Sequence, residues 1–368
     1  MARQASIEQG FALDGIPVSD LRYRNIVPNR LNRPRDYADL VSLELDNHLN
    51  RVRAVQGRDL LLAQFALPNG PPVRASARRR GLPYAVYLRG DDVWIWPHTR
   101  RNGLQSFRET VLGASVVLSV SDALLTEARR LAEDDLPRGV VIANGIDVSL
   151  FRPASDEERA DRRTPLGLPA EGPVVLCVAA ALERKGWPEL LAALARLAPS
   201  PPPLIAVTTG HGDLALRALR DRIAPRVTMV ELRDLDAAKL SEVYRAADIF
   251  CLPSHGEGMS NAVLEALACG LPVITTPVGG HPEVIEPGVD GELVPVRDVG
   301  VLSEVLRNLV VDPARRARMG RAARSRAEAI GTSAENGGRV ARLFDAVLEG
   351  AELPAFLMRS SYAPVTQN

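Results

Sequence analysis

The stretch that decides the fold reads PSHGEGMSNAVLEALACGLPV from Pro253 to Val273. It joins two short apolar runs through a glycine-flanked turn and one helical segment, which is typical of a parallel α/β unit. Gly256 and Gly258 carry no side chains, so backbone N–H groups in this turn can approach a ligand closely. The first turn of the helix leaves N–H groups that suit a phosphate. The stretch therefore predicts a site for a phosphorylated ligand at the end of a buried strand.

Two carboxylates flank this helix N-terminus. Glu257 lies in the turn, and Glu265 follows it with seven residues between them. Glu265 lies five residues beyond Ser260, which is about 7.5 Å along a helix and close to the reach from a diphosphate to the ribose of one nucleotide. The side chain of Ser260 or Asn261 is expected to cap the helix. Surface glutamates share this spacing by chance in many proteins, but the strand–Gly-Glu-Gly–helix frame favours a nucleotide site.

The frame continues outward as alternating strands and helices. Continuously apolar strands that alternate with helices form a parallel sheet covered on both faces. The sequence therefore predicts two doubly wound α/β domains facing a cleft, with ligands outside the carboxyl ends of the strands. Expected strands lie at 174–178, 204–208, 227–232, 249–252 and 273–276 in the second half, and at 60–65, 84–88, 116–120 and 140–142 in the first. Expected helices in the second half lie at 187–197, 214–223, 237–246 and 261–269.

The chain is expected to divide into three parts. Residues 1–150 form an N-terminal, acceptor-side Rossmann-like domain, and residues 151–332 form a C-terminal donor-binding domain of the same kind. Residues 333–368 form a helix and a tail, with the helix packing back on the N-terminal domain. Residues 147–173 hold Pro153, several charges and few apolar residues, so the linker is expected there.

The start of the chain leaves two interpretations open. A helix is expected from Gln4 to Leu13, where a domain of this type normally opens with a buried strand and a glycine turn. Either the first strand lies upstream of Met1, or the domain begins with a helix.

Composition narrows the class of protein. Lys plus Arg and Asp plus Glu both number 45, and this zero net charge argues against a general nucleic-acid binder. No run of about 18 apolar residues is present, and the first residues lack the apolar stretch of a secretory signal. Three cysteines without metal-ligand spacing fit reduced thiols, so a cytoplasmic location is expected. Residues 1–150 hold 20 Arg against 17 Asp or Glu, which leaves peripheral contact with the inner membrane face as an option.

The stretch around Glu257 and Glu265 resembles the E-x7-E motif of the family-4 retaining glycosyltransferases, the glycosyl transferases group 1, which have the GT-B fold. Other stretches resemble the family in the same order along residues 55 to 330, and this order is more specific than any single motif. They are Asn144-Gly145-Ile146-Asp147 with Phe151, Lys185-Gly186, Ala247-Asp248-Ile249 and Gly279-Gly280-His281-Pro282-Glu283.

The resemblance implies transfer of a sugar from a nucleotide-sugar donor, with a UDP- or GDP-sugar expected. Lys185 would neutralise the donor diphosphate, Glu257 would hold the transferred sugar, and Glu265 would bind the ribose hydroxyls. The acceptor would be a polysaccharide, a glycolipid or a small glycoside, and neither a metal nor another cofactor would be required. The other expected donor contacts are Gly256, Gly258, Met259, Ser260, Asn261, Arg184, Leu232 and Arg233.

Two positions depart from the family pattern. The family usually has Arg five residues before the donor lysine, where this chain has Ala180, so that phosphate contact is absent or comes from Arg184. The family often has His in an H-G-x-D turn, which here begins with Arg89. Arg89 would act as a fixed positive charge near the sugar, because a guanidinium cannot be a general base. These departures keep a second hypothesis open, a nucleotide-sugar-binding protein with little or no catalysis.

Other classes fit the sequence less well. A sugar-nucleotide epimerase of the same fold does not explain the Glu257–Glu265 frame, and a nicotinamide dehydrogenase would need a G-x-G-x-x-G turn after an opening strand. Asp91-Asp92 and Asp234-Leu235-Asp236 resemble the acidic pairs that bind metal in another glycosyltransferase fold. Neither follows the right kind of strand, so metal binding is not expected.

Overall fold

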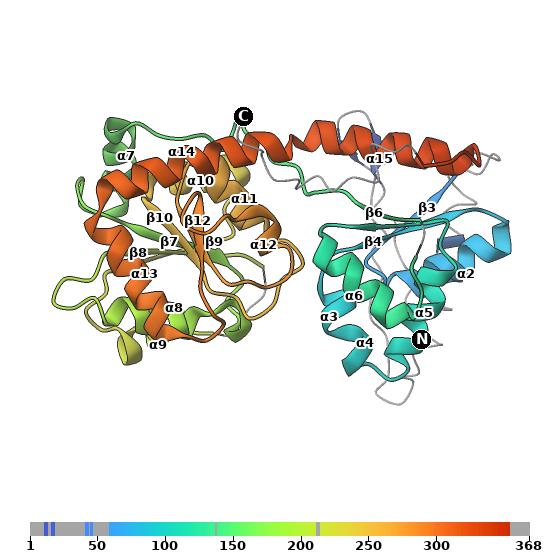
Figure 1. Ribbon diagram of the computed structural model, residues 1–368, viewed down its shortest axis with the longest axis horizontal. Helices are drawn as coiled ribbons and strands as arrows, with labels where there is room; N and C mark the ends of the chain where they lie inside the picture. The colour runs from blue at the N-terminus through green and yellow to red at the C-terminus, as the bar shows by residue number, and fades with distance from the viewer. Residues whose placement is uncertain are drawn as a thin grey trace.

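The structure, a computed structural model, describes residues 11–13, 16–18, 41–43, 45–46, 59–136, 138–210 and 214–353. Figure 1 shows two α/β domains side by side, each built on its own parallel sheet. The predicted architecture of two α/β domains, each with a parallel sheet, is confirmed, and the C-terminal sheet has the reversal of a doubly wound fold.

The C-terminal domain contains a six-stranded sheet in which all neighbouring strands are parallel. Its order is β12-β11-β10-β7-β8-β9, so the chain starts centrally at β7, moves outward to β9 and returns to β10. This reversal between β7 and β10 is where a doubly wound sheet opens a crevice at the carboxyl ends of its strands. The strands are β7 (Val175–Ala179), β8 (Leu204–Thr208), β9 (Met229–Arg233), β10 (Ile249–Leu252), β11 (Val273–Thr275) and β12 (Gly291–Leu293).

The N-terminal domain contains a parallel sheet of order β3-β4-β5-β6. Every residue of β4 and β5 is buried, because helices cover both faces of these apolar strands. The strands are β3 (Leu61–Gln64), β4 (Tyr84–Leu88), β5 (Val116–Ser119) and β6 (Gly139–Val141).

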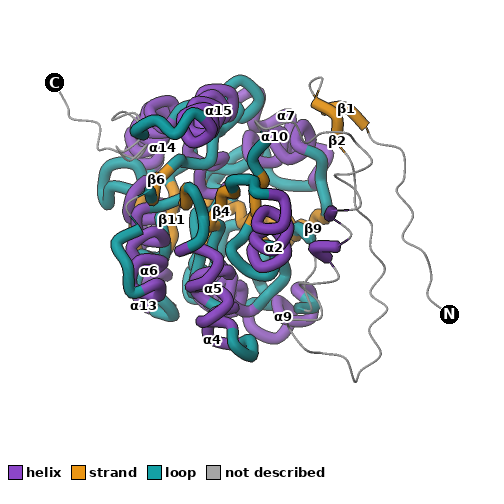
Figure 2. The backbone as a smooth tube through the Cα atoms, turned by 90° about the vertical axis from the view of Figure 1, so that its right-hand side faces the viewer, coloured by secondary structure: helices purple, strands orange, loops and turns teal. Residues whose placement is uncertain are grey.

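Helices surround both sheets (Figure 2). In the N-terminal domain they are α2 (Gly70–Arg80), α3 (Asp91–Trp94), α4 (Trp96–Thr99), α5 (Gly103–Leu112) and α6 (Asp122–Ala132). In the C-terminal domain they are α7 (Asp156–Arg163), η1 (Thr164–Leu166), η2 (Glu183–Lys185), α8 (Trp187–Ala195), α9 (Leu216–Ile223), α10 (Ala237–Ala246), α11 (Asn261–Ala268), α12 (His281–Val284), α13 (Val299–Val311) and α14 (Pro313–Ile330). No helix in the described ranges has both the length and the apolar character to cross a bilayer.

The last helix, α15 (Ser333–Leu348), extends from the C-terminal domain across the N-terminal domain (Figure 1). The chain therefore passes between the domains twice, once before α7 and once between α14 and α15. The two passages are joined where the backbone N–H of Ile146 donates to the carbonyl of Gly331 at 3.3 Å. Gly145 is needed at this junction, because a Cβ there would lie 2.2 Å from the Cα of Ser333.

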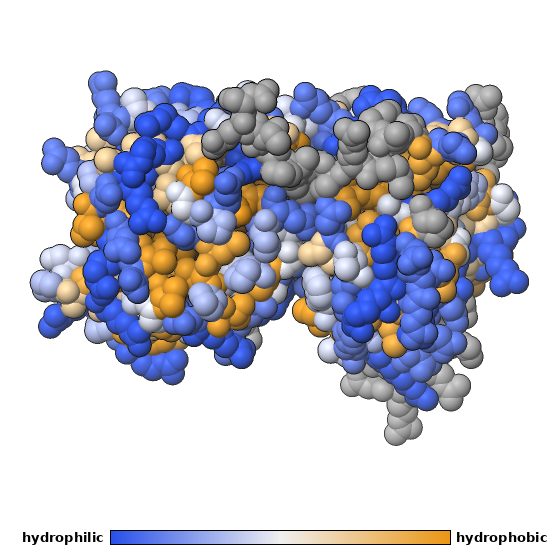
Figure 3. Space-filling view, in the orientation of Figure 1, coloured by the Kyte–Doolittle hydropathy of each residue, from blue (hydrophilic) through white to orange (hydrophobic). Residues whose placement is uncertain are grey.

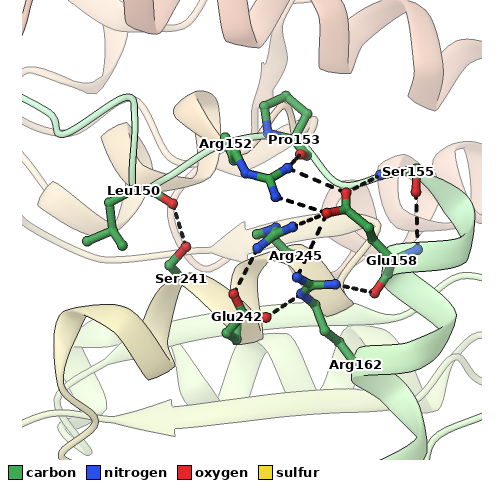
Figure 4. Close-up of polar contacts among 9 residues, drawn as sticks. All are labelled: Leu150, Arg152, Pro153, Ser155, Glu158, Arg162, Ser241, Glu242 and Arg245. Carbon is green, nitrogen blue, oxygen red and sulfur yellow. Dashed lines mark hydrogen bonds and ion pairs between the residues drawn. The ribbon is translucent and has the colours of Figure 1, made fainter.

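The expected linker is more structured than its composition indicated. It contains α7, which begins with a capping box formed by Ser155 and Glu158, a signature that the sequence S-D-E-E carries. Figure 4 shows Glu158 also meeting Arg152 at 2.9 Å and Arg245 at 2.5 Å. Hydrogen bonding from Arg152 and from the Ser155 amide holds the pKa of Glu158 down to about 2. This network fixes the second half of the linker to α10.

The expectation of an opening helix is wrong where the structure describes it. Residues Phe11–Leu13 form strand β1, which pairs antiparallel with β2 (Ile16–Val18). The rest of the expected helix, from Gln4, lies outside the described residues.

Candidate active site

The centre of the site is an ion pair between two loops at the crevice of the C-terminal sheet. Lys185 ends η2 directly after β7, and Glu257 lies in the loop between β10 and α11. Their Nζ and Oε1 atoms are 2.6 Å apart, with the two side chains only 15% and 9% exposed. The loops pack closely, because the carbonyl oxygen of Pro253 occupies the space of a Cβ on Gly186, 2.1 Å from its ideal position. The structure thus brings together the two residues expected to act on the donor.

Glu257 is held in its ionised form. Burial raises its pKa, but the charge of Lys185 and hydrogen bonds from Lys185 and Ser254 outweigh burial, so the pKa lies below its ordinary value. The Ser254 hydroxyl donates to the same Oε1 atom at 2.7 Å. A buried anion and a buried cation are therefore both present before any ligand binds.

The N-terminus of α11 presents unsatisfied backbone donors beside this pair. Ser260 occupies the cap position, but its side chain accepts no hydrogen bond from the helix. Asn261 instead accepts a hydrogen bond from Asn144 of the N-terminal domain at 2.7 Å. The expectation that Ser260 or Asn261 caps the helix is therefore wrong. The first-turn N–H groups are left for an anionic ligand.

Glu265 lies farther along α11 in a mainly apolar setting. The Tyr244 hydroxyl donates to its Oε2 atom at 2.9 Å. Burial raises the pKa of Glu265 to about 7, and the bond from Tyr244 offsets only part of this effect. Glu257 and Glu265 therefore differ in charge near neutrality, although both were expected to bind the same ligand.

The loop between β10 and α11, which we call the donor loop after the ligand expected there, contacts the backbone of the N-terminal domain. A Cβ on Gly258 would lie 2.0 Å from the carbonyl oxygen of Arg89, and a Cβ on Gly90 would lie 3.1 Å from the Gly258 nitrogen. The Gly258 carbonyl accepts a hydrogen bond from the Gly280 amide at 2.8 Å and from the Ser121 hydroxyl at 3.3 Å. The side chain of Met259 is buried beneath this loop. Glycines at these positions allow the two domains to close on each other.

A carboxylate from one domain caps a helix of the other. Glu283 of α12 accepts hydrogen bonds from the backbone amides of Asp122 and Ala123, both at 2.9 Å, at the N-terminus of α6. A second polar contact crosses between Arg184 and Asp91 at 3.2 Å. Figure 3 shows these domains meeting beside a notch in the surface.

Leu232 and Arg233 lie apart from the ion pair, at the carboxyl end of β9. This strand is two places from β7 in the sheet, because β8 lies between them. The two residues help to line a groove of about 630 Å³ with an apolar floor that includes Leu216 and Leu235. Glu231 lies in the wall, 2.6 Å from Arg233. Two of the expected donor contacts thus line this groove, at a distance from the Lys185–Glu257 pair.

Apart from Asp91, which pairs with Arg184, the carboxylates of the two acidic segments accept hydrogen bonds from the backbone. Asp92 is fully buried and accepts hydrogen bonds from the amides of Ala66, Arg89 and Gly90 at 2.7 to 3.0 Å. Asp234 binds the Gly210 amide, and Asp236 caps α10. Within the described ranges, no group of three or more His, Cys, Asp or Glu residues is placed to hold a metal ion.

Several contacts around the site were not predicted from the sequence. Their partners lie 3 to 161 residues away along the chain and meet only in the folded protein. They are Ser254 beside Glu257, Tyr244 beside Glu265, Asp91 beside Arg184, Asn144 beside Asn261, and Glu283 on α6. The glycine loop that contains Glu283 was recognised, but its contact with the other domain was not.

Residues 158–326, which contain the ion pair and α11, match the model of the family "Glycosyl transferases group 1". The C-terminal domain is a group 1 glycosyltransferase domain. The family resemblance inferred from the E-x7-E frame is thereby confirmed.

Relatives in sequence extend this similarity beyond the group 1 domain. The putative teichuronic acid biosynthesis glycosyltransferase TuaC of Bacillus subtilis is 34% identical over 266 residues, which are 72% of this chain and 64% of the relative. The D-inositol 3-phosphate glycosyltransferase of Xylanimonas cellulosilytica is 33% identical over 60% of this chain and 56% of its own length. The chain thus spans less than two thirds of the length of these relatives.

Solved structures confirm the GT-B fold of both domains. The sucrose-phosphate synthase of Thermosynechococcus elongatus matches with a TM-score of 0.74 at 22% identity, covering 94% of this chain and 86% of its own. Anabaena HepE in complex with UDP matches with a TM-score of 0.70 at 21% identity, covering 83% of this chain and 82% of its own. At these identities the likeness concerns the fold alone.

Proposed function

We propose that this chain is a retaining glycosyltransferase that moves a sugar from a UDP- or GDP-sugar to a polysaccharide, glycolipid or small glycoside. The observation that carries the proposal is the Lys185–Glu257 pair beside the open N-terminus of α11, facing the other domain. A diphosphate needs a cation and free backbone donors, and a sugar needs a hydrogen-bond acceptor fixed in place. Lys185, the N-terminus of α11 and Glu257 offer all three where the two loops meet.

In the proposed reaction, the bond between the anomeric carbon and the diphosphate oxygen breaks, and its electron pair leaves with the nucleotide. The acceptor oxygen bonds to the same face of the sugar, and its proton passes to the departing phosphate oxygen. Lys185 and the N-terminus of α11 stabilise the charge that develops on the leaving group. Glu257 accepts hydrogen bonds from the transferred sugar, and its charge faces the cation-like transition state. No metal takes part in this scheme.

The nucleotide is proposed to extend from this loop along the carboxyl edge of the sheet. Glu265 would accept hydrogen bonds from the ribose hydroxyls, and the groove at Leu232 and Arg233 would hold the base. One relative, from Corynebacterium glutamicum, is described as GDP-mannose-dependent, which supports this class of donor, and HepE, which shares the fold, was solved with UDP-glucose. We place the reaction in the cytoplasm, with contact at the inner membrane face when the acceptor is a lipid.

One observation favours a second candidate, a nucleotide-sugar-binding protein with weak catalysis. Ala180 stands where the family has an arginine, and the nearby Arg184 is already paired with Asp91 at 3.2 Å. If Arg184 stays in that pair, the diphosphate has one cation fewer to stabilise it as it leaves. Donor would then bind but turn over slowly.

Saturation-transfer NMR with UDP-, GDP-, dTDP- and ADP-sugars tests the proposal first. We expect transfer to one class of donor, and at least about tenfold weaker binding in Glu265→Ala, which lacks the ribose acceptor. Release of free nucleotide in the presence of acceptors then separates the enzyme from the binding protein. A folded wild-type chain that binds no donor would contradict both candidates.

Donor binding should also depend on pH through Glu265. The ribose hydroxyls need an ionised acceptor, and burial raises the pKa of this carboxyl to about 7. Affinity is therefore expected to rise from pH 6 to 8 and then level off, as titration calorimetry would show. Tyr244→Phe removes a hydrogen bond that lowers this pKa, so it should shift the midpoint upward. Glu265→Gln should show no such dependence, and a profile equal to the wild type would exclude Glu265 as the titrating group.

A further inference from the structure

Arg89 occupies a distinctive place in the cleft. It follows the last residue of β4, and its carbonyl oxygen lies against Gly258 of the donor loop. Its side chain is half-buried and extends over the ring of Tyr87, with the guanidinium carbon 4.9 Å from the ring centroid. The backbone of Arg89 therefore lies in the cleft beside the loop proposed to hold the transferred sugar, and its guanidinium lies over Tyr87 of the same strand.

The other two cations of the cleft are each paired with a carboxylate. Lys185 is paired with Glu257 at 2.6 Å, and Arg184 with Asp91 at 3.2 Å. Among the residues that the structure describes, no carboxylate forms an ion pair with Arg89. The nearby Asp92 is fully buried and bound to three backbone amides. The guanidinium of Arg89 is therefore available to a ligand that carries a negative charge.

The guanidinium is also held in a defined place. Tyr87 is buried, and its hydroxyl donates to the carbonyl of Ile142 at 2.9 Å, which fixes the ring beneath Arg89. A guanidinium stacked on a fixed aromatic ring loses little freedom when it binds, and its planar fork matches the two oxygens of a carboxylate or phosphate.

We propose that Arg89 recognises an anionic group, a carboxylate or a phosphate, on a sugar bound in the cleft. This inference rests on the proposed glycosyl transfer and names its substrate class as an anionic sugar. The group belongs either to the transferred sugar, such as a uronic acid, or to the acceptor. The donor diphosphate is assigned to Lys185 and the N-terminus of α11.

The test compares matched substrates with and without the anionic group. For the donor, titration calorimetry measures the Kd of UDP-glucuronate against UDP-glucose, or of GDP-mannuronate against GDP-mannose. For the acceptor, kcat/KM is measured for uronate- or phosphate-bearing glycosides against neutral ones. Arg89→Gln removes the charge, and Arg89→Lys keeps it without the fork. Arg100→Gln is the control, because Arg100 stacks on Trp96 at the same 4.9 Å but is exposed directly after α4.

We expect the wild type to prefer the anionic member of one pair by about 10- to 100-fold. Arg89→Gln should bring that ratio close to one, Arg89→Lys should restore part of it, and Arg100→Gln should keep it. An equal ratio in the wild type and Arg89→Gln would overturn the inference, as would an equally large loss of affinity for free UDP or GDP. If the wild type binds no nucleotide at all, the proposed function fails and this inference fails with it.

Discussion

Replacing Glu257 by glutamine is expected to lower kcat/KM for glycosyl transfer by about 10²- to 10³-fold. Glutamine keeps the shape of the side chain and an acceptor for the Ser254 hydroxyl, but it removes the negative charge that would face the transition state. Donor binding should weaken far less, because Lys185 and α11 still hold the diphosphate. Nucleotide release with acceptor present measures the first quantity, and calorimetry measures the second.

A control is needed because the same change leaves the ammonium of Lys185 buried without its partner. Breaking a pair this deeply buried lowers the free energy of unfolding by on the order of 3 kcal/mol. The double variant Glu257→Gln/Lys185→Met removes both charges and should regain much of that stability while remaining inactive. If Glu257→Gln turned over at the wild-type rate, the role given to this carboxylate would be wrong.

Gly258→Ala is expected to reduce transfer by a similar factor for a different reason. The added Cβ would lie 2.0 Å from the carbonyl oxygen of Arg89, 2.8 Å from its carbonyl carbon and 3.0 Å from the Cα of Gly90. All three are backbone atoms of the other domain, so no side-chain rotation relieves the clash. The domains must stay apart by an ångström or more, and small displacements of reacting groups cost about 10²-fold in rate.

Small-angle scattering and kinetics together test this expectation. Gly258→Ala should have a larger radius of gyration than the wild type and a lower kcat, while the nucleotide still binds the C-terminal domain. Gly256→Ala is the control for scattering, because a Cβ there meets nothing within 4 Å and the closed dimensions should persist. An unchanged radius with normal kcat in Gly258→Ala would show that closure does not depend on this contact.

The C-terminal domain could be predicted from sequence because its signals are local. Continuously apolar strands such as Leu204–Thr208 alternate with helices, and a glycine turn precedes a helix at the crevice. These features depend on neighbours within about 20 residues. Lys185 and Glu257 lie close together because they follow β7 and β10, which are adjacent strands where the sheet reverses.

The errors arose where tertiary contacts decide the local structure. Asparagine is a common helix cap, but the side chain of Asn261 accepts a hydrogen bond from Asn144, 117 residues earlier. Helix α7 was not expected, because the linker has few apolar residues. The helix is stabilised by its capping box and by the ion pair between Glu158 and Arg245. The partners of Glu283 lie 160 and 161 residues away, and no periodicity in one sequence reveals such a contact.

The two adjacent chain passages at Ile146 and Gly331 limit how the cleft can open. Because a hydrogen bond joins the two passages, they act as one hinge, and one domain rotates about it relative to the other. Displacement grows with distance from that hinge, which lies toward the edge of the molecule that carries α15 (Figure 1). Helix α12, which carries Glu283, and helix α6 lie farther from α15 than the linker does (Figure 1), so the contact between them should break early as the cleft opens. Acceptors would therefore enter from the side opposite α15, where the two domains separate most.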